Sequence, residues 1–182
     1  MARHLFLTGE KRVGKSTLVR ALLAGYPGVV GGFFTMKAEG VVPGRVSVHL
    51  LRAGGREIPS ADNLLFCCGD SDAGAAAARF DVLGCAALEA VPAPGLLVMD
   101  ELGPHEGEAA VFRRAVLAAL EGDVPILGVL QRCNAPFPAQ IAAHPRVQVV
   151  EVTPDNRDRL ARTLVLPGTQ RSVACAGPGS LA

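Results

Sequence analysis

The sequence is poor in aromatic residues and nearly balanced in charge. Its 182 residues include no tryptophan and one tyrosine, and the formal net charge is +1. This balance, with no long basic run, offers no electrostatic basis for binding a nucleic acid. Hydrophobic residues make up 49% of the chain, which is typical of a helix-covered α/β core rather than of a disordered or coiled-coil chain.

Long apolar segments are also missing. The longest candidates are interrupted by Glu89 and Pro92, or by Glu121 and Asp123, and stay well short of the ~20 residues that cross a membrane. The first apolar run, residues 5–7, is too short for a secretion signal. We therefore expect a cytoplasmic protein without a membrane partner.

The five cysteines do not form a metal-binding or disulfide pattern. None are spaced as C-x-x-C, and the count is odd. Cys67 and Cys68 are adjacent and would point to opposite faces of a strand. Buried reduced thiols are the favoured interpretation, and a zinc site is the alternative.

Short apolar runs alternate with helical patterns along most of the chain. This alternation predicts an α/β fold with a mostly parallel sheet flanked by helices. The expected strands are 4–8, 29–36, 45–51, 63–68, 95–101, 125–132 and 147–152. The expected helices are 15–25, 78–91, 107–122, 138–144 and 153–165.

One segment departs from the alternation. Residues 37–70 suggest an antiparallel hairpin inserted after the second strand, with a turn signal at 53–56. The last residues, 166–182, have the composition of a flexible tail. We therefore expect a single domain over residues 1–165.

A phosphate-binding loop follows the first strand. Gly9, Gly14, Lys15 and Ser16 match G-x-x-x-x-G-K-[ST], the P-loop or Walker A pattern, between a strand and a helix. Backbone N–H groups of such a loop converge on the β-phosphate, the lysine reaches the β- and γ-phosphates, and the serine hydroxyl coordinates Mg²⁺. We predict that the nucleotide contacts the whole loop: Gly9, Glu10, Lys11, Arg12, Val13, Gly14, Lys15, Ser16 and Thr17.

A buried strand at 95–101 ends in two acids, as in a Walker B motif. Asp100 is the predicted second Mg²⁺ residue, and Glu101 is the predicted base that orients a water for attack on the γ-phosphate. An ordinary strand end is the alternative. Successive strand residues point to opposite faces, so the strand must end or bend at Glu101 for both acids to face the phosphates. The turn residues at 103–104 fit such a bend.

Other positions are less decisive. Gln131 and Arg132 end the next strand, where they would sense the γ-phosphate or only terminate the strand. No guanine-reading [NT]KxD tetrad follows a candidate strand, which disfavours a Ras-like switch. The interval between strands 125–132 and 147–152 is too short for an arginine-rich kinase lid, so a kinase would need its acceptor site elsewhere, for instance in 37–70.

Four further motifs, in order, resemble those of the THEP-type P-loop nucleoside-triphosphatases, the family that includes cancer-related nucleoside-triphosphatase-like proteins. They are "GGFFTMKAEG", "ARFDVLGCAALEAV", "MDELGPHEG" and "VTPDNRDRL", and the similarity spans about residues 3–165. The chain departs from the family in having Glu10, Lys11 and Arg12 where proline and glycine are usual, and His105 where methionine is common.

The resemblance implies a RecA-like sheet, with one strand between the P-loop and Walker B strands, and slow, Mg²⁺-dependent hydrolysis of ATP, GTP and other nucleoside triphosphates. It also implies a role for Asn156 and Arg157. These would contact the base or ribose, stabilise transition-state charge, or only begin a helix. We favour a hydrolase. The alternatives are a small-molecule or nucleoside kinase and a non-catalytic nucleotide-binding accessory protein.

Overall fold

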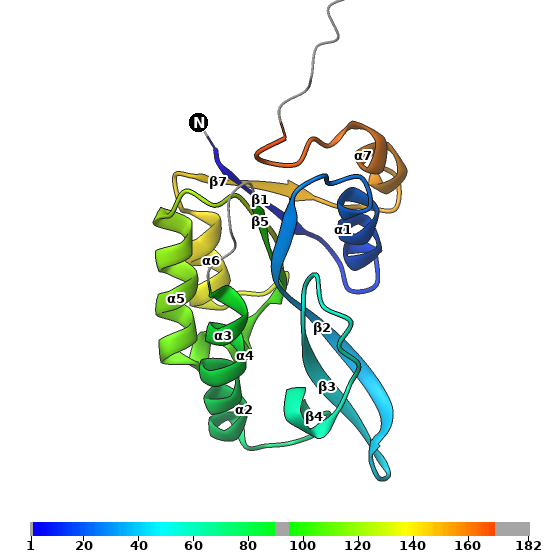
Figure 1. Cartoon of the computed structure of the whole chain (residues 1–182), viewed down its shortest axis with the longest axis vertical. Coiled ribbons are helices and arrows are strands. Elements are labelled where there is room, and N and C mark those ends of the chain that lie inside the picture. Colours follow the sequence, from blue (N-terminus) through cyan, green and yellow to red (C-terminus); the bar gives the residue numbers. More distant parts are fainter. Residues whose placement is uncertain (1, 90–94, 170–182) are drawn as a thin grey trace, which may run out of the picture.

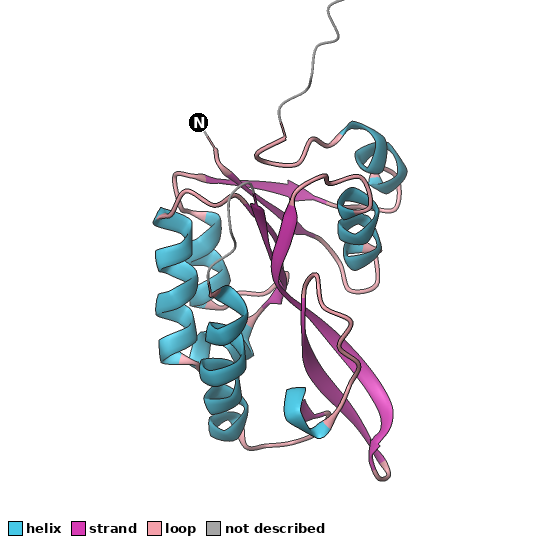
Figure 2. Cartoon of the chain, in the orientation of Figure 1, coloured by secondary structure: helices cyan, strands magenta, loops and turns pink. Residues whose placement is uncertain are grey.

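The computed structural model describes residues 2–89 and 95–169 of the chain, which form one sheet with helices on both faces (Figures 1 and 2). The sheet has seven strands in the order β4-β3-β2-β5-β6-β1-β7. The strands are β1 (His4–Thr8), β2 (Val29–Val42), β3 (Arg45–Arg52), β4 (Leu64–Cys67), β5 (Gly95–Leu102), β6 (Ile126–Leu130) and β7 (Val147–Glu151). The helices are α1 (Lys15–Leu23), η1 (Ala61–Asn63), α2 (Ala73–Arg79), η2 (Phe80–Gly84), α3 (Cys85–Leu88), α4 (Pro104–Glu108), α5 (Ala110–Glu121), α6 (Pro136–Ala142) and α7 (Arg157–Thr163).

The central strands confirm the predicted RecA-like arrangement. β2, β5, β6, β1 and β7 run parallel, and β6 lies between β1 and β5. The loop after β1 and the acids at the end of β5 therefore lie at the same edge of the sheet, two strands apart. Ligands of open α/β sheets bind at the carboxyl ends of parallel strands, and this edge is the expected place for a site.

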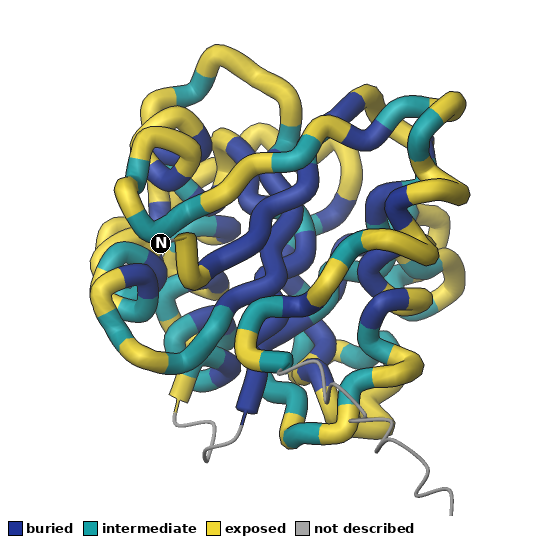
Figure 3. The backbone as a smooth tube through the Cα atoms, turned by 90° about the horizontal axis from the view of Figure 1, so that it is seen from above, coloured by how far each residue is buried: buried dark blue, intermediate teal, exposed yellow. Residues whose placement is uncertain are grey.

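Each face of the sheet has its own apolar core. Phe6, Met99 and Phe112 belong to the core under α2–α6, whereas Leu7 and Val98 belong to the core under α1 and α7. Neighbouring residues of β1 and β5 thus alternate between the two cores, as strand geometry requires. Figure 3 shows the buried strands running through the centre of the molecule.

The predicted antiparallel hairpin is confirmed, and an extension of β2 forms its first strand. β2 pairs with β5 up to Phe33 and continues as the partner of β3 to Val42. Figure 1 shows this hairpin reaching beyond the parallel strands. β4 adds a third antiparallel strand. The predicted turn at 53–56 is confirmed at the start of the connection from β3 to its antiparallel partner β4, where the N–H of Gly55 donates to the carbonyl of Arg52. The tighter β2–β3 turn at 43–44 was not predicted.

A buried polar chain stabilises this antiparallel part. The hydroxyl of Ser47 lies 2.7 Å from Nε2 of His49, and Nδ1 of His49 lies 2.9 Å from Oδ1 of Asn63. The Asn63 amide donates to the carbonyl of Ile58. The three side chains tie β3 to η1, and Ser47 and His49 are fully buried and therefore closed to a substrate.

Three expected helices have different limits. The helix expected at 78–91 begins at Ala73 and includes a π-helical turn, η2; its expected end at 90–91 lies outside the described residues. The helix expected at 107–122 is two helices, α4 and α5, broken at Ala109. The helix expected at 153–165 begins only at Arg157.

The remaining expectations concern the cysteines, the tail and the membrane. Cys67 is buried at the end of β4, whereas Cys68 lies in the turn after β4 and is exposed, and Cys133 is exposed as well. Leu166 packs into the core beside α1; Cys175 and the tail from 170 onward lie outside the described residues. Among the helices that the structure describes, none has the length and apolar character needed to cross a membrane.

Candidate active site

The loop between β1 and α1 is organised around Lys15. Its ammonium group donates hydrogen bonds to the carbonyl oxygens of Gly9 and Glu10, at 2.9 and 2.8 Å, and its side chain is buried. α1 begins at Lys15 and has no acidic residue in its first turn. A lysine charge and the positive end of a helix dipole therefore meet in one loop, an arrangement that favours a bound phosphate.

Gly14 gives the loop its shape. Its φ is 101°, a left-handed conformation that side chains disfavour. A Cβ atom at this position would also lie 2.8 Å from Cδ of Arg157. The guanidinium of Arg157 donates to the carbonyl of Val13, at 3.3 Å. The glycine thus lets Arg157 pack directly against the phosphate-binding loop.

The end of β5 bends at Glu101. Glu101 has a φ of 61°, and the pairing of β5 with β6 shifts register between Met99 and Leu102. The predicted bend is confirmed. Asp100 stays buried at 2% exposure, while Glu101 is partly exposed and lines the cavity above the loop.

Asp100 meets the loop through Ser16. The Ser16 hydroxyl donates to Oδ1 of Asp100, at 3.4 Å. Burial raises the pKa of Asp100 to about 6, and the neighbouring charge of Glu101 adds to that rise, whereas Ser16, Arg20 and Lys15 oppose it. The charges of Arg20 and Lys15 do not offset the effect of burial on Asp100, so a bound cation would further stabilise its ionised carboxylate.

The donor set fits magnesium bound together with a nucleotide. Mg²⁺ is typically held by one or two protein oxygens, several waters and substrate phosphates. Ser16 and Asp100 supply two such oxygens. Within residues 2–89 and 95–169, no group of three or more His, Cys, Asp or Glu side chains is placed to hold a metal alone. Phosphate oxygens would therefore complete the coordination.

A cavity of about 270 Å³ joins these elements. It opens beside the loop and reaches the end of β5. Its lining consists of Arg12, Gly14, Lys15, Ser16, Thr17, Glu101 and Val129. The structure thus brings together the loop and Glu101, from elements that are about 85 residues apart in the sequence.

Asn156 and Arg157 take different positions at the start of α7. Asn156 uses its amide within the turn, where Oδ1 accepts from the N–H of Thr153 and Nδ2 donates to the carbonyl of Glu151, at 2.9 and 2.8 Å. Arg157 instead reaches the phosphate-binding loop. The geometry favours the helix-start interpretation for Asn156 and keeps Arg157 as a candidate for contact with a nucleotide.

Gln131 and Arg132, the two polar residues that follow β6, also have different contacts. Arg132 forms ion pairs with Glu10 and Glu151, at 3.1 and 3.0 Å. All three side chains are more than half exposed, so each pair stabilises the fold only weakly. Gln131 lies against Gly103, on the segment that follows Glu101. One residue thus contacts the phosphate-binding loop and the other contacts the Walker B segment.

Sequence reasoning missed Glu106, a buried carboxyl on α4. Its Oε2 accepts a hydrogen bond from the N–H of Gly103, at 2.7 Å. Burial raises the pKa of Glu106 to about 7, and the charge of Glu101 adds to the rise. The only signal in the sequence was local: a glutamate three residues after a helix-starting glycine fits half of a capping box.

Glu106 predicts a pH-dependent stability. A carboxyl with a raised folded-state pKa stabilises the fold fully below its ordinary pKa of 4.5, and this stabilisation is lost as the pH rises through about 7. Glutamine does not ionise, so Glu106→Gln should not lose this stabilisation. The difference in unfolding free energy between Glu106→Gln and wild type should therefore be about 1–3 kcal/mol larger, in favour of the variant, at pH 8 than at pH 4.5. Urea unfolding at both pH values measures this gain. Glu108→Gln, at an exposed position of α4, is the control; an equal gain in both variants would refute the prediction.

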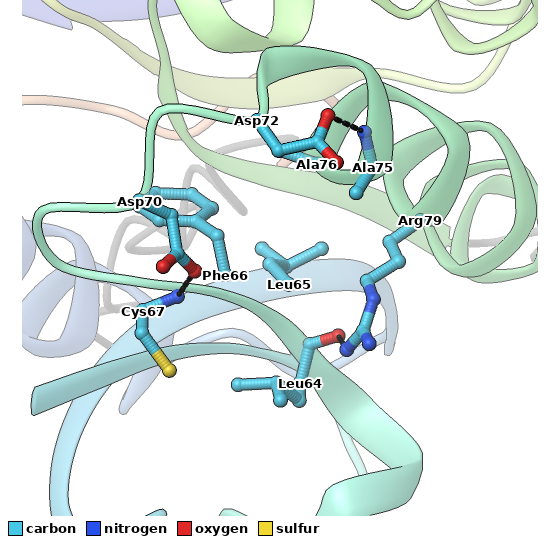
Figure 4. A pocket seen from close by; sticks show the side chains of 9 residues that line it. All are labelled: Leu64, Leu65, Phe66, Cys67, Asp70, Asp72, Ala75, Ala76 and Arg79. Atoms are coloured by element: carbon cyan, nitrogen blue, oxygen red, sulfur yellow. Dashed lines mark hydrogen bonds between the residues drawn. The ribbon is translucent and has the colours of Figure 1, made fainter. Parts of the chain in front are cut away.

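A second, smaller cavity of about 80 Å³ lies between β4 and α2 (Figure 4). Its polar side chains are engaged with the backbone. Asp70 accepts from the N–H of Cys67, Asp72 accepts from the N–H of Ala75, and Arg79 donates to the carbonyl of Leu64. The Arg79 bond attaches α2 to β4, the Asp70 bond closes the turn after β4, and the Asp72 bond caps α2, so all three have structural roles.

Comparisons with known proteins cover the same region. A family model described as NTPase matches residues 4–165. The nucleoside-triphosphatase THEP1 of Thermotoga petrophila is 25% identical over 165 residues, which are 88% of this chain and 90% of that protein. Crystalline THEP1 from the hyperthermophile Aquifex aeolicus has a TM-score of 0.71 at 21% identity, over 89% of this chain and 96% of that chain. The solution structure of a human cancer-related nucleoside triphosphatase has a TM-score of 0.58 at 27% identity, over 88% and 94%.

Proposed function

This chain belongs to the NTPase family, and from that membership we propose that it hydrolyses nucleoside triphosphates, slowly and with Mg²⁺, to nucleoside diphosphates and phosphate. The relative from Thermotoga petrophila is named a nucleoside-triphosphatase, which supports the proposal. The observation that carries it is the cavity in which Lys15, Ser16 and Glu101 meet.

Each of these side chains has a defined part in the proposed reaction. Lys15 holds the β- and γ-phosphates by charge, and Ser16 and Asp100 would hold the magnesium ion, which would supply positive charge to the phosphate oxygens when bound. Glu101 orients a water and accepts its proton as the water oxygen bonds to the γ-phosphorus. The bond from that phosphorus to the diphosphate oxygen breaks, and the proton leaves Glu101 for the released phosphate.

Phosphate release without a second substrate tests the proposal. Purified protein is incubated with MgATP, MgGTP, MgCTP and MgUTP, and the released phosphate and nucleoside diphosphate are measured. Hydrolysis should produce the two in equal amounts. Nucleoside diphosphate that forms only with an added hydroxyl acceptor, together with the phosphorylated acceptor and without free phosphate, would favour a kinase. Tight nucleotide binding with no turnover would favour an accessory protein.

Broad base tolerance is a second expectation of this proposal. The sequence lacks a guanine-reading tetrad, and the residues that line the cavity come from the phosphate-binding loop, β5 and β6, which suit phosphates rather than base edges. We expect kcat/KM to differ by less than about a thousand-fold across the four triphosphates, which is ~4 kcal/mol of transition-state binding. Steady-state kinetics at saturating Mg²⁺ measure this ratio, and a larger preference for one base would contradict the expectation.

A further inference from the structure

The turn after Glu101 is held at two points. On one side, the N–H of Gln131 donates to the carbonyl of Leu102, at 2.8 Å, which fixes the turn to β6. On the other side, the N–H of Gly103 donates to Oε2 of Glu106, at 2.7 Å, which fixes it to α4. Both bonds are made by one peptide group, the one between Leu102 and Gly103, one residue after Glu101.

Glu101 needs such support. A left-handed backbone is unfavourable for a residue with a side chain and persists only where neighbouring groups determine it. A regular strand would turn the carboxylate of Glu101 away from the side on which the phosphates bind. The direction of that carboxylate therefore depends on the turn that the two hydrogen bonds hold.

The bond from Gly103 is well protected. Glu106 is 7% exposed, and Gly103 is buried as well. Water competes weakly for a buried hydrogen bond, so its geometry is more fixed than at an exposed helix start. α4 is itself held, because the His105 ring packs on Phe66 of β4 with 5.3 Å between ring centroids.

The close packing of the turn adds to this constraint. A Cβ atom at Gly103 would lie 2.3 Å from Oε1 of Gln131. A larger residue at this position would have to displace the end of the Gln131 side chain, so Gln131 packs directly on the turn.

From these contacts we propose that Glu106 is a positioning residue for the hydrolytic reaction. By accepting the Gly103 N–H, it holds Glu101 in its left-handed conformation, with the carboxylate directed into the nucleotide cavity. This inference rests on the proposed function, since it assigns a second residue to the same reaction. Glu106 acts through its hydrogen bond and not through its charge.

Three substitutions of Glu106 separate the effect of its hydrogen bond from the effect of its charge. Glu106→Met fills the same space without an acceptor, and Glu106→Asp keeps the charge but is one methylene too short. Both should lower kcat by about 10–100-fold with KM for MgATP changed less than about threefold, because a misdirected base affects the chemical step more than binding. Glu106→Gln keeps an acceptor oxygen and should stay within about threefold of wild type. Glu108→Gln is the exposed control on the same helix.

A double mutant tests whether Glu106 acts through Glu101. In a Glu101→Gln background, Glu106→Met should lower kcat by less than about twofold more, because residues that act as a unit are not additive. Full additivity would overturn the proposal, as would a Glu106→Gln variant as slow as Glu106→Met. Glu106→Asp at the wild-type rate would overturn it too, and this variant keeps a polar group should Glu106→Met fail to fold.

Amide hydrogen exchange supplies a readout that does not depend on activity. The Gly103 amide should exchange slowly in wild type and Glu106→Gln, and at least about tenfold faster in Glu106→Asp and Glu106→Met. Unchanged exchange in the folded variants would refute the inference. If wild-type protein releases no phosphate, the proposed function fails and the inference with it. If wild type is active and the variants match it, only the inference fails.

Discussion

Lys15→Ala is expected to abolish phosphate release and to weaken triphosphate binding. The ammonium group of Lys15 is the buried positive charge of the phosphate-binding loop, held by the carbonyls of Gly9 and Glu10. Its removal takes away the charge that, in the proposed mechanism, faces the β- and γ-phosphates, and also the hydrogen bonds that order the loop. We expect kcat/KM to fall by about 10³-fold or more, equivalent to ~4 kcal/mol of transition-state stabilisation.

The matched control is Lys37→Ala. Lys37 is exposed on β2 and does not line the nucleotide cavity, so its loss should leave kcat/KM within about twofold. Phosphate release measures turnover, and titration with a fluorescent triphosphate measures binding. If Lys15→Ala retains near wild-type hydrolysis, the phosphate-binding assignment of this loop is wrong.

The parallel core of the fold could be predicted from the sequence because its signals are local. Each central strand is a short apolar run between turn residues. In the strand–loop–helix pattern at residues 4–23, the loop contains Gly9 and Gly14 at the spacing of a P-loop. The family resemblance placed one strand between β1 and β5, and the structure confirms it. Local pattern and family motifs agreed in this region.

The breaks in helices could not be predicted, because distant residues determine them. The helix expected from residue 107 is interrupted at Ala109, and the new helix, α5, starts where the carboxylate of Asp81 accepts from the N–H groups of Val111 and Phe112. A helix start capped by a side chain 30 residues earlier leaves no mark in the local pattern.

The candidate site, like the fold, could be predicted from the sequence only in part. Residues of the phosphate-binding loop and the two acids of β5 are visible as motifs, and the bend at Glu101 follows from the need to present both acids on one side. Arg157 against Gly14 and Glu106 against Gly103 depend on tertiary contacts. Burial changes the properties of such groups most, and a sequence motif does not show which side chains are buried.

Glu101→Gln is expected to lower kcat while leaving the binding of MgNTP nearly intact. The substitution keeps the size of the side chain and its place at the bend, but an amide cannot accept a proton from the attacking water. The loss of a general base typically costs about 10²–10⁴-fold in rate. The affinity for a non-hydrolysable MgNTP analogue should stay within about threefold, because Glu101 contacts the water rather than the phosphates in this mechanism.

Asp100→Asn separates the second acid from the first. Asp100 is buried beside the hydroxyl of Ser16, so its loss should raise the Mg²⁺ concentration needed for half-maximal rate as well as lower kcat. Glu101→Gln should leave that concentration unchanged. Phosphate release across a Mg²⁺ titration measures both effects. Equal shifts of the Mg²⁺ requirement in the two variants would mean that both acids bind the metal. Hydrolysis by Glu101→Gln at the wild-type rate would show that Glu101 is not the base, and would favour the kinase or the binding protein.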